Sequence, residues 1–218
     1  MGSIRLRPVN TQPRTLTERR KAATQLDIAR AAMELFTEHG PDATTAEDIA
    51  QRAGVALRTF YRYFRSKQDA VGPLLAAGGE HWRALLAATD PGTPLRQALE
   101  AAAAASLAEP GEAAREGLER TRTLLRAAEG DPALRAVWYR VNQESEERLV
   151  PVVARLAGPG TDSLQHRLAA AAATDAIRIS LEVWAQSDAG TSGPGSPADL
   201  AIRCLRSLPL TDPAPATD

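Results

Sequence analysis

Cysteine, aromatic residues and long apolar runs are all scarce in this chain of 218 residues. Its one cysteine, Cys204, has no partner within the chain, so a disulfide scaffold is excluded and a packed core must hold the fold. No apolar run reaches the roughly eighteen residues that a membrane helix needs, and we therefore expect no membrane role. Residues 1–30 also lack the apolar core of a secretory signal, which makes the cytoplasm the expected location.

The chain has almost no net charge, but its charges are unevenly distributed. It carries 26 Lys+Arg and 27 Asp+Glu, for a formal net charge of -1. Residues 1–67 hold 12 Lys+Arg against 7 Asp+Glu, whereas residues 68–218 hold 14 against 20. A basic first third is typical of a chain that brings one end to phosphate groups, although a solvated basic tail would give the same counts.

Catalytic and metal-binding patterns are also missing. The three histidines, His39, His81 and His166, lie far apart in the sequence, and Cys204 has no neighbouring acid–base partner. No pair of these residues has the spacing of a zinc site. We therefore expect no catalytic residues, no metal and no cofactor. A helical enzyme, or a carrier of apolar molecules, remains an alternative because a missing motif is weak evidence.

Strand patterns are nearly absent while helix-forming residues dominate, so the sequence predicts an all-α chain of about nine helices. Capping residues placed before prolines, as in Thr93-Pro94, Asp131-Pro132 and Ser196-Pro197, mark several helix starts. We expect a kink or restart at Pro151. Apart from two short helices around Gly54, the predicted helices are 24–39, 66–88, 94–108, 112–128, 132–157, 163–187 and 197–207. The predicted domains are a disordered basic arm at 1–18, a first helical domain at 19–67, a second helical domain at 68–210 and a disordered tail at 211–218.

Residues 45–64 have the pattern of a helix-turn-helix. Thr45 and Asp48 have the spacing of a capping box that opens a short helix, and Gly54 provides the turn before a second helix that begins near Ala56. Four apolar residues would anchor this second helix on the first predicted helix: Val55, Leu57, Phe60 and Phe64. The opposite face presents groups that suit base edges and phosphates: Arg58, Thr59, Arg62 and Tyr63.

Ser66 and Asp69 repeat the capping pattern and predict the start of the helix at 66–88. Lys67 would lie in its first turn, where the helix dipole disfavours a cation. A DNA phosphate at this position would resolve the conflict, because it could bind both the ammonium and the free amides. An exposed lysine at a modest energetic cost is the alternative.

Over residues 20–70 the chain resembles the N-terminal domain of TetR-type regulators. The resemblance is carried by Phe36 and Gly40, and by the segments 45–50, 53–55, 59–64 and 66–67. It implies a three-helix DNA-binding domain followed by a helical ligand-binding and dimerisation domain. It also implies homodimers whose recognition helices enter successive major grooves of a palindromic operator. The family often has Ser or Thr where this chain has Ala56, which places one phosphate contact in doubt.

Carried over to this sequence, the resemblance assigns DNA contacts to seven residues. Thr45, Tyr61 and Lys67 would touch phosphates. Arg58 and Thr59 would read bases, with Arg62 and Tyr63 close by. Tyr61 is also expected to be partly core.

Residues 132–157 resemble, more loosely, the effector domain of TetR-type regulators that bind acyl-coenzyme A. This implies an elongated apolar ligand with an anionic head, which Arg122, Arg126 or Arg178 would pair with. Four aromatic residues are the expected lining: Trp82, Trp138, Tyr139 and Trp184. Ordinary core packing is the alternative for each of them.

The predicted helix 163–187 has two apolar stripes and so needs two partners. One stripe includes Leu164, Leu168 and Ile179, and the other includes Leu181 and Trp184. We expect one to pack within its own domain and the other, with helix 197–207, against a second copy. Complete burial of both stripes within a single copy is the alternative. The function that the residues favour is a ligand-responsive repressor released from its operator by a small apolar or acyl-type effector. An activator, or a regulator that needs no ligand, would have the same sequence features.

Overall fold

The computed structural model describes residues 15–108, 111–158 and 160–209. Within these ranges it contains nine α-helices and one short 3-10 helix, with no strand, which confirms the predicted all-α fold. The helices are α1 (Leu16–His39), α2 (Ala46–Arg52), α3 (Leu57–Tyr63), η1 (Asp69–Val71), α4 (Gly72–Ala88), α5 (Leu95–Leu107), α6 (Glu112–Gly130), α7 (Pro132–Ala157), α8 (Ser163–Ala185) and α9 (Pro197–Ser207).

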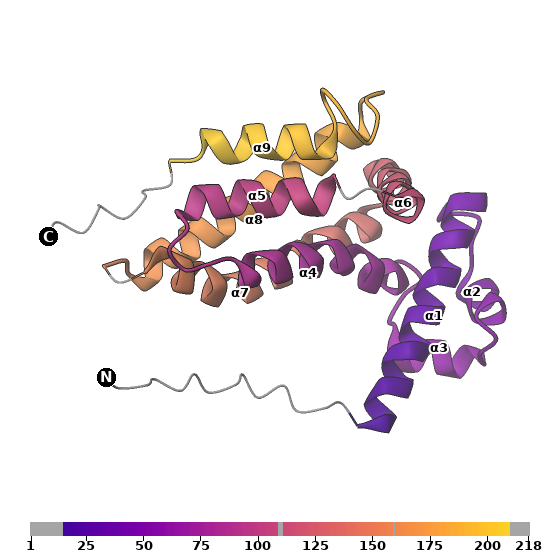
Figure 1. Ribbon diagram of the computed structural model, residues 1–218. Coiled ribbons are helices and arrows are strands. Elements are labelled where there is room, and N and C mark those ends of the chain that lie inside the picture. The colour runs from indigo at the N-terminus through magenta and orange to yellow at the C-terminus, as the bar shows by residue number, and fades with distance from the viewer. Residues whose placement is uncertain (1–14, 109–110, 159, 210–218) are drawn as a thin grey trace, which may run out of the picture.

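The first three helices form a small group at one end of the molecule, and α4 runs from this group into a larger helical body (Figure 1). In that body α4 packs on α7, α7 packs on α8, and α5 and α9 lie side by side. Helix α6 contacts both α1 and the α7–α8 pair. One continuous apolar core extends through both parts of the chain, from Ile28 on α1 to Leu205 on α9.

Helix α1 begins earlier than the sequence predicted. Thr15 caps it, since the Glu18 amide donates to Thr15 Oγ1 at 3.2 Å and the Thr15 amide donates to Glu18 Oε2 at 2.7 Å. This capping box was overlooked because the first apolar stripe starts only near Thr24. The predicted arm at 1–18 is therefore too long at its C-terminal end. Residues 1–14 and the predicted tail at 211–218 lie outside the described residues.

The helix expected at 66–88 starts instead at Gly72. Ser66 does accept a hydrogen bond from the Asp69 amide at 3.1 Å, but the turn it closes leads into η1 rather than into an α-helix. Pro73 explains the later start, because proline fits the first turn of a helix and would disrupt the interior of a longer one. Lys67 thus lies in a linker between α3 and α4.

The caps at Asp131 and Ser196 lie where the prolines predicted them, and α7 and α9 have the predicted bounds. Helix α7 continues through Pro151 without a break, so the predicted restart there is wrong. The other predicted helices differ from the observed ones by two residues or fewer at each end.

Arginine side chains close the C-terminal ends of several helices in the larger body. Arg155 donates to Leu86 O and Ala87 O on α4 at 3.0 Å each, and Arg96 donates to the carbonyl groups at the end of α9. Arg135 similarly binds the last turn of α6. The free carbonyl groups of a helix end attract cations, so these bonds satisfy the helix termini and tie neighbouring helices together.

Candidate DNA-binding and ligand-binding sites

Helices α2 and α3 are joined by the tight turn that the sequence predicted. Gly54 has φ +66°, a conformation that residues with a side chain rarely adopt. The Thr45–Asp48 capping box is formed at the start of α2, as predicted. Phe60 is fully buried and packs α3 on the core formed by the first three helices. Phe64, the residue after α3, is buried as well. The two helices therefore form a helix-turn-helix.

Arg52 fastens α2 to α1 from the outside. Its guanidinium donates to both carboxylate oxygens of Glu38, at 3.1 and 2.8 Å, and to Glu34 at 3.4 Å. The hydrogen bond from Arg52 lowers the pKa of Glu38, although this pair is largely exposed. This contact adds a polar link between α2 and α1 at the surface.

Helix α3 exposes three of the predicted DNA-contacting side chains to solvent. Arg58, Tyr61 and Arg62 are exposed, and their spacing of three and four residues makes them neighbours on one surface of the helix. Tyr61 is 55% exposed, which corrects the expectation that it is partly core. Thr59 and Tyr63 are half-buried, and the Arg62 guanidinium lies 5.1 Å from the centre of the Tyr63 ring. Ala56 leaves α3 without a side-chain cap.

Thr45 is exposed, but its hydroxyl is already engaged. Thr45 Oγ1 accepts from the Asp48 amide at 3.1 Å and donates to Asp48 Oδ2 at 2.7 Å. The side-chain bond from Thr45 lowers the pKa of Asp48. To donate to a phosphate, the Thr45 hydroxyl would have to give up its bond to Asp48.

Lys67 is half-buried, so the alternative of a simply exposed lysine is corrected. Its Nζ donates to Thr44 O at 2.9 Å, which ties the α3–α4 linker to the residue before the α2 cap. Thr44 is buried and bonds back to Gly40 O at 2.9 Å. An ammonium has three protons, so this bond leaves Lys67 able to donate to a phosphate as well.

The same linker is bound to the start of α7, a connection that the sequence did not reveal. Gln68 Nε2 donates to Asp131 Oδ2 at 2.8 Å, while Asp131 Oδ1 caps α7. Arg140 Nη2 donates to Asp69 Oδ1 at 2.8 Å. Burial alone would raise the pKa of Asp131, but hydrogen bonds from Gln68 and from the α7 amides, with Lys67 nearby, lower this pKa on balance.

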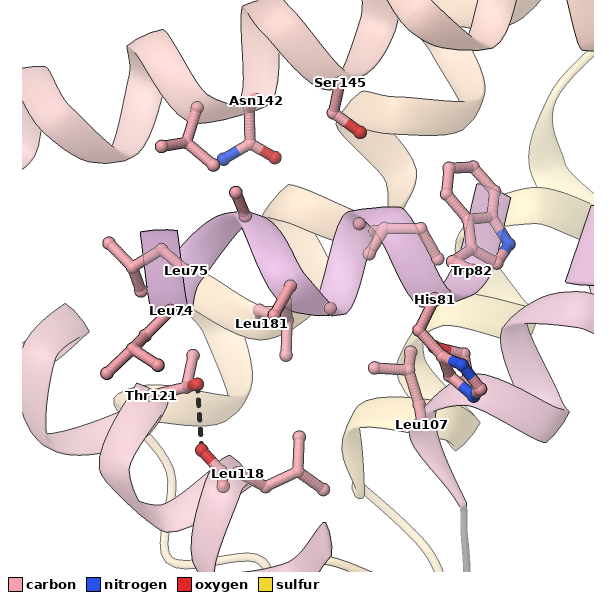
Figure 2. A pocket seen from close by; sticks show the side chains of 18 of the residues that line it. Leu74, Leu75, His81, Trp82, Leu107, Leu118, Thr121, Asn142, Ser145 and Leu181 are labelled. Carbon is pink, nitrogen blue, oxygen red and sulfur yellow. Dashed lines mark hydrogen bonds between the residues drawn. The ribbon is translucent and has the colours of Figure 1, made fainter. Parts of the chain in front are cut away.

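The larger body contains a cavity of about 300 Å³ between α4, α5, α6, α7 and α8, and its lining includes the exposed residues Ala77, Gly78 and His81. Helix α4 forms one wall along residues 74–82, and Figure 2 shows Trp82 and His81 at one end of this stretch with Leu74 and Leu75 at the other. Of the six predicted ligand-binding residues, Trp82 and Trp138 line this cavity. The remaining described lining is Ala76, Ala77, Gly78, Gly79, Ser106, Leu107, Ala114, Gly117, Leu118, Thr121, Val141, Asn142, Ser145, Thr174, Ile177 and Leu181.

Two glycines inside helices line this cavity, and neither has a side chain that could fill it. A Cβ atom on Gly78 of α4, or on Gly117 of α6, would lie more than 4 Å from every atom other than its chain neighbours and the backbone of its own helix. A glycine inside a helix costs about 0.5–1 kcal/mol relative to alanine. The chain thus accepts weaker helices where larger side chains would fill the cavity. These two glycines, placed inside predicted helices, are the signal in the sequence that points to this site.

The predicted arginines do not line the cavity, and each has a structural partner. The Arg122 guanidinium stacks on the Trp184 ring at 3.8 Å and donates to Ala189 O. Arg126 binds Ala185 O at 2.6 Å. Arg178 pairs with Asp175 and Glu182 at 2.9 and 2.8 Å. The expectation that one of them meets a ligand head within this cavity is therefore corrected.

Tyr139 and Trp184 are also absent from the cavity wall. Tyr139 is 49% exposed and lies under the Arg178 guanidinium, 5.3 Å from it. Trp184 is fully buried, and its Nε1 donates to Ala189 O and Gly190 O. Trp138 lines the cavity with its ring, and its Nε1 also donates to Glu182 at 2.7 Å.

Helix α8 has the two apolar faces that were predicted. Leu181 and Trp184 are buried against the same chain. The other face remains open in the single chain and carries large exposed side chains: Leu164, Leu168, Ile179 and Val183. We call these four residues the α8 face. Leu164 and Leu168 are 73% and 67% exposed, which is unusual for neighbouring leucines on one helix.

No group of three or more His, Cys, Asp or Glu residues in the described part of the chain lies close enough together to hold a metal ion. No helix in this part of the chain combines the length and the apolar composition needed to cross a bilayer.

The sequence is similar to bacterial transcriptional regulators. The family described as "Bacterial regulatory proteins, tetR family" matches residues 28–71, which include α2, α3 and the linker to α4. The HTH-type transcriptional regulator TcmR of Streptomyces glaucescens is 32% identical over 149 residues. That match covers 67% of this chain and 66% of TcmR, just under two thirds of its length.

Solved structures share the fold over most of the chain. The TetR family repressor AlkX of Dietzia, implicated in biodegradation of n-alkanes, has a TM-score of 0.58 at 21% identity, and the match covers 83% of this chain and 92% of AlkX. The Thermus thermophilus repressor FadR, in complex with lauroyl-CoA, has a TM-score of 0.50 at 25% identity, covering 89% and 99% of the two chains.

Proposed function

The chain belongs to the tetR family of bacterial regulatory proteins, and on that premise we propose that it is a transcriptional repressor. It binds a palindromic operator as a homodimer and leaves that operator when a small molecule enters the cavity. The observation that carries this proposal is the helix-turn-helix, whose α3 presents Arg58, Tyr61 and Arg62 to solvent. Binding to chromosomal DNA implies that it acts in the cytoplasm.

The proposed DNA interface divides its work between two kinds of contact. Arg58 and Thr59, in the first turn of α3, read base edges in the major groove, with Arg62 and Tyr63 beside them. Tyr61 and Lys67 bind phosphates, and Thr45 adds a contact if its hydroxyl turns away from Asp48. The Lys67–Thr44 bond supports this arrangement because it holds the two phosphate-facing segments together.

Dimerisation is proposed to use the α8 face together with α9. Exposed leucines at these positions are costly for an isolated chain, and a second copy would bury them. A two-fold dimer places two copies of α3 in successive major grooves, with half-sites about one turn, or 34–36 Å, or more apart. Palindromic DNA matches that symmetry.

Release from DNA is proposed to run through α4 and the linker. Helix α4 forms a wall of the cavity, and the linker before it is bound to α7 through Gln68 and Asp69. A molecule that fits the cavity better in one arrangement of α4 and α7 therefore favours one placement of α3. Coupling of about 1–3 kcal/mol would weaken operator binding by roughly 5–150-fold.

The effector is proposed to be small and lipophilic. The lauroyl-CoA bound to FadR supports an acyl-type molecule, since FadR shares the fold over nearly its full length. The mostly apolar cavity supports the wider class of apolar molecules. FadR is also named a repressor, which supports the proposed sign of regulation.

An electrophoretic mobility shift with DNA from beside the protein's own gene tests this function. We expect a retarded band that a duplex of shuffled sequence does not give. The band should disappear when one class of a panel of lipophilic metabolites and acyl-CoA esters is added. Absence of any sequence-preferring complex would refute the regulator, whereas a complex that effectors strengthen would refute release as the mechanism.

A further inference from the structure

The cavity wall carries no strong charge. Its described lining contains no Asp, Glu, Lys or Arg, and His81, the one ionisable residue among them, is exposed. An anionic group drawn into this space would lose its water without gaining a cation, which is strongly unfavourable. Arg122 and Arg178 lie on helices that line the cavity, but Arg122 donates to Ala189 O and Arg178 pairs with Glu182.

Ser145 interrupts the apolar face of α7 where that face meets the cavity. The buried positions of this face follow one another at spacings of three and four residues, and Ser145 occupies the middle of the series Leu134, Trp138, Val141, Ser145, Leu149, Val152 and Leu156. No described residue forms a hydrogen bond with its hydroxyl. A Cβ atom on Gly79 would lie 2.9 Å from Ser145 Oγ, so a larger residue at position 79 would force this hydroxyl to move.

Asn142 lies one turn before Ser145 and adds a second polar group. Its Nδ2 donates to Trp138 O at 2.9 Å, which fixes the amide and leaves Oδ1 as an acceptor. Figure 2 shows both side chains projecting from α7 toward α4. Thr174 Oγ1, on another cavity-lining residue, is buried without a partner. The polar groups therefore include a donor and an acceptor side by side, surrounded by apolar side chains.

We propose that the effector is an uncharged, mostly apolar molecule with a hydrogen-bonding oxygen, and that Ser145 and Asn142 bind this oxygen. Its apolar part lies between α4, α6 and α8, in the space that Gly78 and Gly117 leave open. That the bound molecule acts as an effector rests on the proposed function. The binding chemistry itself follows from the cavity. It replaces the anionic head group that the sequence had suggested.

The first experiment locates the site with a neutral probe that contains no oxygen, N-phenyl-1-naphthylamine, whose fluorescence rises on apolar binding. We expect the full chain to bind it and Gly78→Leu to weaken binding about tenfold or more, because the leucine fills the cavity. Gly130→Leu is the matched control, since Gly130 ends α6 away from the cavity and also has open space around its Cβ position. Gly117→Leu repeats the test from the opposite wall.

These variants replace helical glycines by a better helix former, so they should melt at or above the wild-type temperature. Lost probe binding with an unchanged melting temperature therefore reports a filled cavity and not an unfolded chain. If the wild type fails to bind the probe, or if Gly78→Leu and Gly117→Leu bind it as the wild type does, the cavity is not the site and the inference is overturned.

The second experiment tests charge with two molecules of the same shape. Neutral 2-naphthamide and anionic 2-naphthoate compete for the bound probe near neutral pH. We expect the amide to compete about tenfold or more better than the carboxylate. Equal competition, or a preference for the carboxylate, would overturn the claim that the effector is uncharged.

The third experiment tests the polar contact. Ser145→Ala should weaken competition by 2-naphthamide about fivefold and leave the affinity for N-phenyl-1-naphthylamine unchanged. Unchanged amide binding would remove Ser145 from the site. None of these measurements contains DNA, so they can succeed while operator release fails. Conversely, a chain that binds its operator but prefers the naphthoate would keep the proposed function and lose this inference.

Discussion

Lys67 connects two parts of the DNA-binding end, and its replacement by alanine tests both of its expected contacts. The side chain is half-buried and Nζ donates to Thr44 O at 2.9 Å. The chain contains one other lysine, Lys21, which is exposed on α1. Lys21→Ala is therefore a matched control that changes the net charge equally.

The expected loss of stability follows from the Lys67–Thr44 bond. A hydrogen bond from a charged donor contributes about 1.5–3 kcal/mol, and partial exposure reduces this to about 1–2 kcal/mol here. For a chain of this length such a loss lowers Tm by about 2–8 °C. If Lys67 also binds a phosphate, the slope of log K against log salt becomes shallower by about 0.9 for each copy of Lys67, or about 1.8 for a dimer on its operator.

Thermal melting and fluorescence anisotropy at several salt concentrations measure these two effects separately. We expect Lys67→Ala to show both a lower Tm and a shallower salt slope, and Lys21→Ala to keep the wild-type Tm. A lower Tm with an unchanged salt slope would refute the phosphate contact and leave Lys67 a structural residue. Equal changes of slope in both variants would mean that overall charge, and not this contact, sets the salt dependence.

Four further outcomes are expected from single changes. Arg58→Ala should weaken operator binding by about 1–3 kcal/mol and relax base preference; equal losses on operator and shuffled DNA in anisotropy would contradict base reading. Leu168→Glu should convert dimers to monomers in light scattering, and an unchanged mass would exclude the α8 face. Since the pKa of Asp131 is lowered in the fold, its stabilising effect is present above its ordinary pKa near 3.8 and is lost as the pH falls below it. Asp131→Asn, which can still cap α7, should therefore melt at a lower temperature than the wild type at neutral pH and at the same temperature below the ordinary pKa of Asp131. Arg155→Ala should lower the free energy of unfolding by about 1–3 kcal/mol in urea, because three carbonyl groups at the end of α4 lose their donor.

Local signals predicted much of the fold. A capping residue before proline depends on its immediate neighbours, so Asp131-Pro132 and Ser196-Pro197 located the starts of α7 and α9. The helix-turn-helix was readable for the same reason, since Thr45, Asp48 and Gly54 act within a few residues of one another. The late start of α4 was also readable, because Pro73 belongs in the first turn of a helix.

Contacts between distant residues could not be predicted in this way. A guanidinium on a helix has the same sequence signal whether it meets a ligand anion or the end of another helix. Arg122 and Arg126 lie more than fifty residues before the carbonyl groups that they bind. The Gln68–Asp131 bond similarly joins residues that are 63 positions apart. Aromatic residues raised a related problem, because Trp82 lines the cavity and Trp184 is core, although both are tryptophans on helices.

A footprint of the full chain on DNA from beside its own gene tests the central claim most directly. Two copies of α3 in successive major grooves should protect two half-sites with two-fold related sequences, whose centres lie about one helical turn, or 34–36 Å, or more apart. Arg58→Ala should weaken both halves together. A single asymmetric protected patch, or no protection at concentrations where the chain binds DNA, would contradict a dimeric repressor that reads its operator through α3.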